Sequence, residues 1–113
     1  MKFKKEFIED TENIFEMSNL SPRKTGLKKI IWISVKGNAK HGPRIKVYKN
    51  NSGKGENFSV TIGDTPSTIG DVFIKSKDLN DIFEFIKINK DVLLKHWNNT
   101  IFADEAIDAI ISV

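Results

Sequence analysis

The chain has 113 residues, a net charge of +3 and no cysteine. This length predicts one domain over residues 1–113, and the lack of cysteine excludes disulfides and thiolate metal sites. No apolar run approaches the ~20 residues of a membrane span, and the charged start MKFKKEFIED lacks the apolar core of a secretory signal. We therefore expect a cytoplasmic protein with no membrane partner and no cofactor.

The basic residues are concentrated in one acid-free segment. No Asp or Glu occurs between Glu16 and Glu56, whereas ten Lys and Arg fall in that interval. The net charge is −2 over residues 1–22, +10 over residues 23–54 and −5 over residues 55–113. A general preference for lysine would also produce basic surfaces, but it would still scatter the acids. The segregation therefore predicts an anionic partner, either nucleic acid or an acidic protein.

The first part of the chain predicts a helix, a connector and a strand. Residues 3–17 carry apolar side chains at helical spacing and predict an amphipathic helix. Residues 20–29 form a basic connector. The β-branched and aromatic run over residues 30–36 predicts a strand with Trp32 and Lys36 on one face.

Three more strands are predicted, over residues 44–49, 57–63 and 71–75, with loops over 50–55 and 64–70. Short connections between successive strands favour an antiparallel four-stranded β-meander. Alternation along these three strands predicts the following inward residues: Ile45, Val47, Phe58, Val60, Ile62, Val72 and Ile74.

Beyond residue 77 the apolar period becomes helical. It predicts a helix over residues 78–97 with Asp78 as its N-cap, either kinked near Asn89 or divided there into two helices. A short helix over residues 103–111 ends the chain. Strands followed by helices indicate an α+β domain, in which the N-terminal helix and the C-terminal helices pack on the meander. The apolar stripe of the long helix is Leu79, Ile82, Phe83, Ile86, Leu93 and Trp97.

The outward face of the predicted sheet is the candidate site, because its strands alternate basic and aromatic residues there. Such faces bind single strands, since cations contact phosphates and aromatic rings stack on bases. The alternative is that the predicted helix 3–17 covers this face and buries Trp32 as core. The candidate nucleic-acid- or anion-binding residues are Trp32, Lys36, Lys40, His41, Arg44, Lys46 and Tyr48.

Several short motifs carry a resemblance: Thr25-Gly26-Leu27, Ile31-Trp32-Ile33, His41 to Val47, and Leu93-Leu94 before Trp97. Over about residues 25–98 the chain resembles a group of small uncharacterised bacterial proteins. It is more distantly similar to a family of unknown function with P-x-x-x-V on a strand and L-L-x-x-W on a C-terminal helix. Arg44 and Lys46 stand where that family has two histidines. The resemblance implies a toxin–antitoxin or mobile-element setting and no reaction.

The sequence supports catalysis or metal binding less strongly than it supports binding of an anionic partner. His41 and His96 lie in different predicted elements without the spacing of two ligands on one helix, so we expect no metal site. A metal-independent ribonuclease would use His41 as base and Arg44, Lys46 and Tyr48 to stabilise the transition state.

The favoured hypothesis is a small non-enzymatic binding module for single-stranded nucleic acid or RNA. One alternative is an antitoxin- or inhibitor-like protein that binds an acidic partner in a toxin–antitoxin, phage-defence or mobile-element context. The other alternative is the ribonuclease, and no oligomeric state is predicted.

Overall fold

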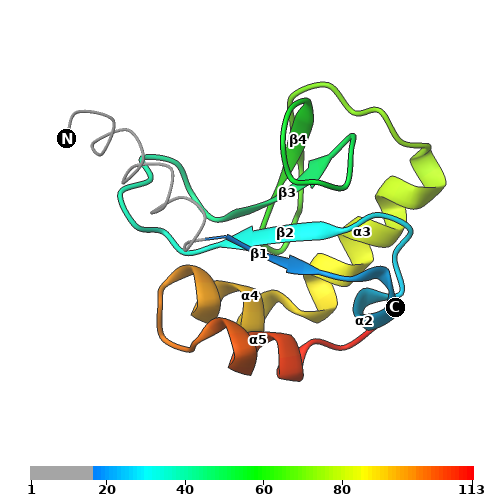
Figure 1. Cartoon of the computed structure of the whole chain (residues 1–113). Coiled ribbons are helices and arrows are strands. Elements are labelled where there is room, and N and C mark those ends of the chain that lie inside the picture. The colour runs from blue at the N-terminus through cyan, green and yellow to red at the C-terminus, as the bar shows by residue number, and fades with distance from the viewer. Residues whose placement is uncertain (1–16) are drawn as a thin grey trace.

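The computed structural model describes residues 17–113, so the predicted helix over 3–17 lies outside the described residues except for its last position. Within 17–113, an antiparallel five-stranded sheet of order β1-β2-β3-β4-β5 is combined with helices, which confirms the α+β class. Figure 1 shows α4 and α5 lying below β1 and β2. The strands are Met17–Leu20 (β1), Ile31–Ser34 (β2), Arg44–Tyr48 (β3), Asn57–Thr61 (β4) and Thr68–Ile69 (β5). The helices are Pro22–Thr25 (α2), Ser76–Ile88 (α3), Lys90–Trp97 (α4) and Ala103–Ala109 (α5).

The two outer strands differ from the prediction of four strands. β1 lies where we expected the end of a helix and the start of a connector, and it pairs with β2 in the register Leu20↔Ile31. The predicted strand over 71–75 is wrong, because β5 forms inside the predicted loop and Val72 is exposed. β5 has only two residues and cannot show a period of two, and β1, with the sequence MSNL, lacks the β-branched and aromatic residues typical of strands.

The predicted basic connector contains α2. The Ser21 hydroxyl accepts a hydrogen bond from the Lys24 N–H at 3.3 Å, and Pro22 stands in the first turn. Gly26 closes the helix in the left-handed region, with φ of 83°. Ser before Pro at the start and Gly at the end are standard helix signals, so the sequence contained the evidence for this helix.

The long predicted helix is divided at Asn89, which confirms the alternative of two helices. Asn89 is 2 % exposed, and its amide donates to the Phe85 carbonyl at 3.0 Å. The same side chain donates to the Ile111 carbonyl at 2.9 Å and accepts from the Ile111 N–H at 2.8 Å. Asn89 thereby ties the helix junction to the C-terminal tail, whose last residue donates from Val113 N–H to the Thr25 carbonyl at 2.8 Å.

Helix α3 begins earlier than predicted. Its N-cap is Lys75, and Asp78 lies in the first turn rather than at the cap. A carboxylate in the first turn still stabilises the helix through its dipole. Asp78 also lies 3.6 Å from the Lys28 ammonium, which joins α3 to the segment before β2.

The core lies between one face of the sheet and the helices. The residues predicted to face inward from β2, β3 and β4 are buried, but β4 does not alternate, because Ser59 on its outward side is 5 % exposed, and Tyr48 at the end of β3 is also buried. Phe85 joins the predicted helical stripe as a fully buried residue. Burying each such side chain contributes roughly 1.5–3 kcal/mol, and a slip of one residue would turn a whole strand over. The core therefore determines which side chains stand on the opposite sheet face. The most buried members are Leu20, Ile31, Ile45, Val47, Phe58, Val60, Ile82, Phe85, Ile86 and Leu93.

Candidate functional site

The sheet face turned away from the core, here called the outer face, carries one row of side chains that crosses every strand of the sheet. Asn19 pairs with Trp32, and Trp32 pairs with Lys46. Lys46 pairs in turn with Ser59, and Ser59 with Ile69. Directly opposed residues have Cβ atoms about 4.5–5.5 Å apart. The register therefore places a lysine beside an indole in the middle of the sheet.

Trp32 and Tyr48, both predicted for this site, are in contact on the outer face. Their ring centroids lie 5.9 Å apart with an interplanar angle of 78°, an edge-to-face arrangement. Tyr48 is only 7 % exposed, and burial raises the pKa of its phenol. Trp32 is partly buried. Tyr48 therefore supports the indole from the side, while most of its own ring is covered.

Arg44 and Lys46 extend the outer face along β3, and both are partly buried. Among the described residues, two N–H groups of this face are buried without an acceptor, namely Nε1 of Trp32 and Nε of Arg44. An unsatisfied buried donor costs about 1–3 kcal/mol. Both groups could donate to a ligand rich in acceptor oxygens only after the atoms that cover them move aside.

The remaining predicted site residues, Lys36, Lys40 and His41, lie on the connection between β2 and β3 and are exposed. This connection packs against the end of α4: Lys36 N–H donates to the Trp97 carbonyl at 2.7 Å. The rings of His41 and Trp97 lie 5.6 Å apart. The structure thus divides the predicted set into a group on strands β2 and β3 and a group on the loop that joins them.

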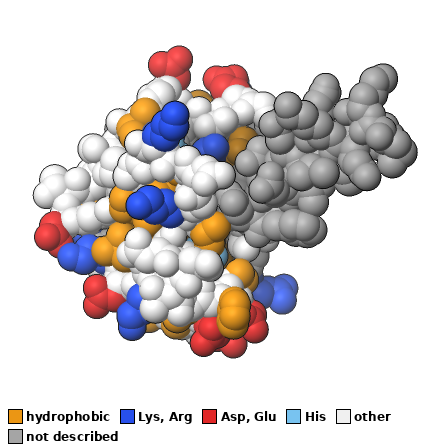
Figure 2. All heavy atoms as spheres, turned by 90° about the vertical axis from the view of Figure 1, so that its left-hand side faces the viewer, with side chains coloured by type: hydrophobic (Ala, Val, Ile, Leu, Met, Phe, Trp, Pro, Cys, Tyr) orange, Lys and Arg blue, Asp and Glu red, His pale blue; other side chains and the backbone are white. Residues whose placement is uncertain are grey.

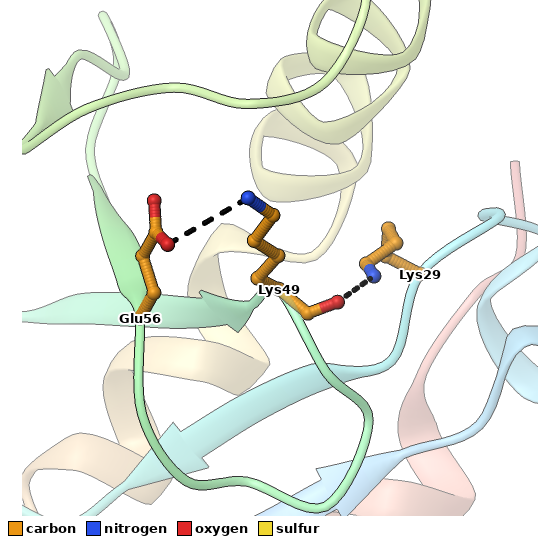
Figure 3. A network of polar contacts seen from close by, with 3 residues as sticks. All are labelled: Lys29, Lys49 and Glu56. Carbon is orange, nitrogen blue, oxygen red and sulfur yellow. Dashed lines mark hydrogen bonds and ion pairs between the residues drawn. The ribbon is translucent and has the colours of Figure 1, made fainter.

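Some basic residues of the acid-free segment bind to other parts of the chain. Lys29 donates from Nζ to the Lys49 carbonyl at 3.0 Å, and Lys49 Nζ lies 3.7 Å from Glu56 Oε1 (Figure 3). Lys28 pairs with Asp78 as described above. Within residues 17–113, the basic residues of the segment that make no ion pair are Arg23, Lys24, Lys29, Lys36, Lys40, Arg44, Lys46 and Lys54.

The basic side chains do not form a single cluster on the face drawn in Figure 2. Figure 2 shows Lys and Arg side chains standing apart from one another on the visible face, with hydrophobic and uncharged atoms between them. Exposed charges separated by more than about 8 Å are largely screened at physiological salt. A ligand with regularly spaced negative charges suits such a distribution better than a single compact anion.

His96 is a buried polar residue, which the sequence analysis considered only as a possible metal ligand. It is 3 % exposed, and its Nδ1 has no partner among the described residues. Burial lowers the pKa of this imidazole, and a backbone hydrogen bond at Ser34 opposes that shift. The ring therefore stays neutral at neutral pH.

The described surroundings of the two histidines do not favour metal binding or acid–base catalysis. The part of the chain that the structure describes contains no cluster of three His, Cys, Asp or Glu suited to a metal ion. His41 Nδ1 lies 2.8 Å from the Gly42 carbonyl, and its ring lies against Trp97. Neither contact supplies a catalytic acid.

One hollow lies elsewhere, between the β4–β5 loop and the junction of α3 and α4. Lys90 Nζ donates to Asp64 Oδ1 at 2.6 Å within it. Its two lysines are matched by two aspartates, so it favours neither sign of ligand. The lining residues are Gly63, Asp64, Lys87, Ile88, Lys90 and Asp91.

Comparison with known proteins gives no further constraint. No family model, no curated protein and no solved structure matches this chain. None of the helices within residues 17–113 has the length and apolar character needed to cross a membrane.

Proposed function

We propose that this protein is a small, non-enzymatic cytoplasmic module that binds single-stranded nucleic acid, RNA in particular, on the outer face of its sheet. The observation that carries the proposal is the cross-strand pair of Trp32 and Lys46. Proteins that bind single strands combine a stacking surface for bases with cations that follow the backbone. Arg44, two residues from Lys46 on the same face of β3, supplies the next cation along that path.

The buried donors add a second argument. Phosphate oxygens are strong acceptors, and guanidinium groups bind them with charge-assisted hydrogen bonds. Arg44 Nε and Trp32 Nε1 both lack an acceptor within residues 17–113. A phosphodiester on the outer face would supply the missing oxygens once the atoms that cover these two N–H groups move aside.

The test is a charge reversal on β3. The Arg44→Glu, Lys46→Glu variant should lose nearly all affinity for a labelled single-stranded RNA in fluorescence anisotropy, because two cations become two anions beside Trp32. The matched control is Lys75→Glu, Lys77→Glu, which makes the same charge change at exposed positions outside the acid-free segment. Thermal melts establish that both variants fold. A folded β3 variant that binds RNA as the parent does would contradict the proposal.

A second candidate is an acidic protein partner, as for an antitoxin or an inhibitor of a defence nuclease. It is favoured by Ile69, which stands 46 % exposed at the end of the outer-face row. Protein interfaces combine apolar anchors with a charged rim. Binding of an acidic polypeptide by a parent protein that ignores RNA would favour this candidate.

A further inference from the structure

The loop between β3 and β4 lies directly on Trp32. Gly53 in this loop has φ of +79°, and a Cβ atom at that position would lie 2.6 Å from Cζ2 and 2.7 Å from Cη2 of the indole. It would also lie 3.1 Å from Cε2, the ring atom bonded to Nε1. Only glycine fits a backbone that is both left-handed and in contact with a ring. The benzo edge of Trp32 is therefore covered by the loop backbone.

The contacts at the base of this loop are polar and exposed. Lys49 N–H donates to the Glu56 carbonyl at 2.8 Å, and the two side chains form the ion pair of Figure 3 with exposed fractions of 62 % and 58 %. Exposed ion pairs stabilise little, and segments with little apolar burial open readily. The exposed loop residues are Asn50, Asn51, Ser52, Lys54 and Gly55.

The covered state also leaves a donor unsatisfied. Trp32 Nε1 is buried without an acceptor among the described residues. When the loop moves away from the indole, this N–H becomes able to donate to water or to a ligand. The covered arrangement therefore carries the free-energy cost of an unsatisfied donor, and the open arrangement does not.

We propose that residues 49–56 form a lid over Trp32, and that the opened indole stacks on one unpaired base of a single strand. This proposal rests on the proposed function. It adds that the lid regulates RNA binding, because Trp32 becomes a stacking surface only when the lid is open. Lys54, next to Gly53, is an exposed cation that moves with the lid. The apparent affinity is then the intrinsic affinity reduced by the fraction of molecules that are open.

Two glycines of the lid provide a matched test. Gly53→Ala introduces both backbone strain and a collision with the indole, so it should drive the lid off Trp32. Gly55→Ala introduces similar strain, at φ of +85°, but its Cβ would meet nothing within 4 Å. Acrylamide quenching of tryptophan fluorescence reports the uncovering of Trp32, since Trp97 is only 4 % exposed. Anisotropy with a labelled uridine-rich single strand reports binding.

We expect greater quenching in Gly53→Ala than in the parent or in Gly55→Ala, and an affinity higher by about threefold or more. Glu56→Gln, which removes only the exposed ion pair, should shift quenching in the same direction by less. This second variant keeps the test valid if Gly53→Ala fails to fold.

If the folded variants show the same acrylamide quenching as the parent, the proposal that residues 49–56 form a lid is wrong. If the parent binds RNA and Gly53→Ala uncovers Trp32 without tighter binding than Gly55→Ala, the lid's role in binding is overturned while the proposed function stands. If the parent binds no single strand at low salt, the proposed function fails and the base-stacking part of the lid proposal fails with it.

Discussion

Trp32 and Lys46 stand opposite each other on β2 and β3, on the side of the sheet turned away from the core. The pairing follows from the buried alternation of both strands, because Ile31 and Ile33 on β2 and Ile45 and Val47 on β3 must all face the helices. A cation and an aromatic ring are thereby held side by side on a rigid element. Sites built on strands hold their geometry better than sites built on loops.

The first prediction concerns Trp32. Trp32→Ala should weaken binding of single-stranded RNA by about 1–3 kcal/mol, because one stacked base loses its partner. The dependence of affinity on salt should stay unchanged, since no cation is removed. Anisotropy titrations at several salt concentrations measure both quantities. An unchanged affinity in a folded variant would remove Trp32 from the site.

Trp97 should behave differently, because it belongs to the core. It is 4 % exposed, and its carbonyl accepts the Lys36 N–H at the end of α4. Trp97→Ala should lower the free energy of unfolding by about 3–5 kcal/mol, measured by urea denaturation. Typical domains have only about 5–15 kcal/mol in total, so a stability close to that of the parent would contradict this placement.

The alternative of a ribonuclease predicts a specific loss. If His41 were a general base, His41→Ala should lower cleavage by roughly 10²-fold or more. We expect no metal-independent cleavage of a generic RNA by the parent, because neither the hydrogen bond of His41 with the Gly42 carbonyl nor its contact with the Trp97 ring supplies a catalytic acid. Turnover by the parent that disappears in His41→Ala would overturn the binding module.

His96 predicts a dependence of stability on pH. Its folded-state pKa lies below the ordinary value of about 6.5 because the ring is buried. As pH falls through about 6.5, the unfolded chain takes up a proton that the folded chain does not, so the free energy of unfolding decreases. The decrease continues until the pH reaches the folded-state pKa. Urea titrations between about pH 7.5 and 5.5 should show this decrease in the parent and a flatter profile in His96→Gln. Equal profiles would contradict the account.

Most of the sheet and the strand part of the site follow from local pattern. Strands β2 and β3 alternate up to Val47 because one face is buried, so the common outer face of Trp32, Arg44, Lys46 and Tyr48 was predictable. The burial of Ser59 on β4 departs from that pattern. Strands β1 and β5 were not predictable, because each is defined by pairing across the sheet. The division at Asn89 depends on hydrogen bonds with Ile111, which is distant in sequence.

The finer features of the site depend on contacts between distant segments. Lys36 and His41 are carried to the end of α4 by the packing of the β2–β3 connection on Trp97. Tyr48 is buried by its neighbours, and Trp32 is covered by a loop that begins 17 residues after it and meets it at Gly53. Alternation along one strand contains no information about any of these contacts.

The salt dependence of RNA binding by the parent protein tests the central claim most directly. If Arg44, Lys46 and neighbouring lysines contact about four phosphates of a single strand, log K should fall with log salt at a slope near −3. Raising salt from 50 to 200 mM should then weaken binding on the order of 50-fold, and Arg44→Glu, Lys46→Glu should flatten the slope. A parent protein with no affinity for single strands at 50 mM salt, or with affinity that is independent of salt, would contradict the claim that this sheet face binds nucleic acid.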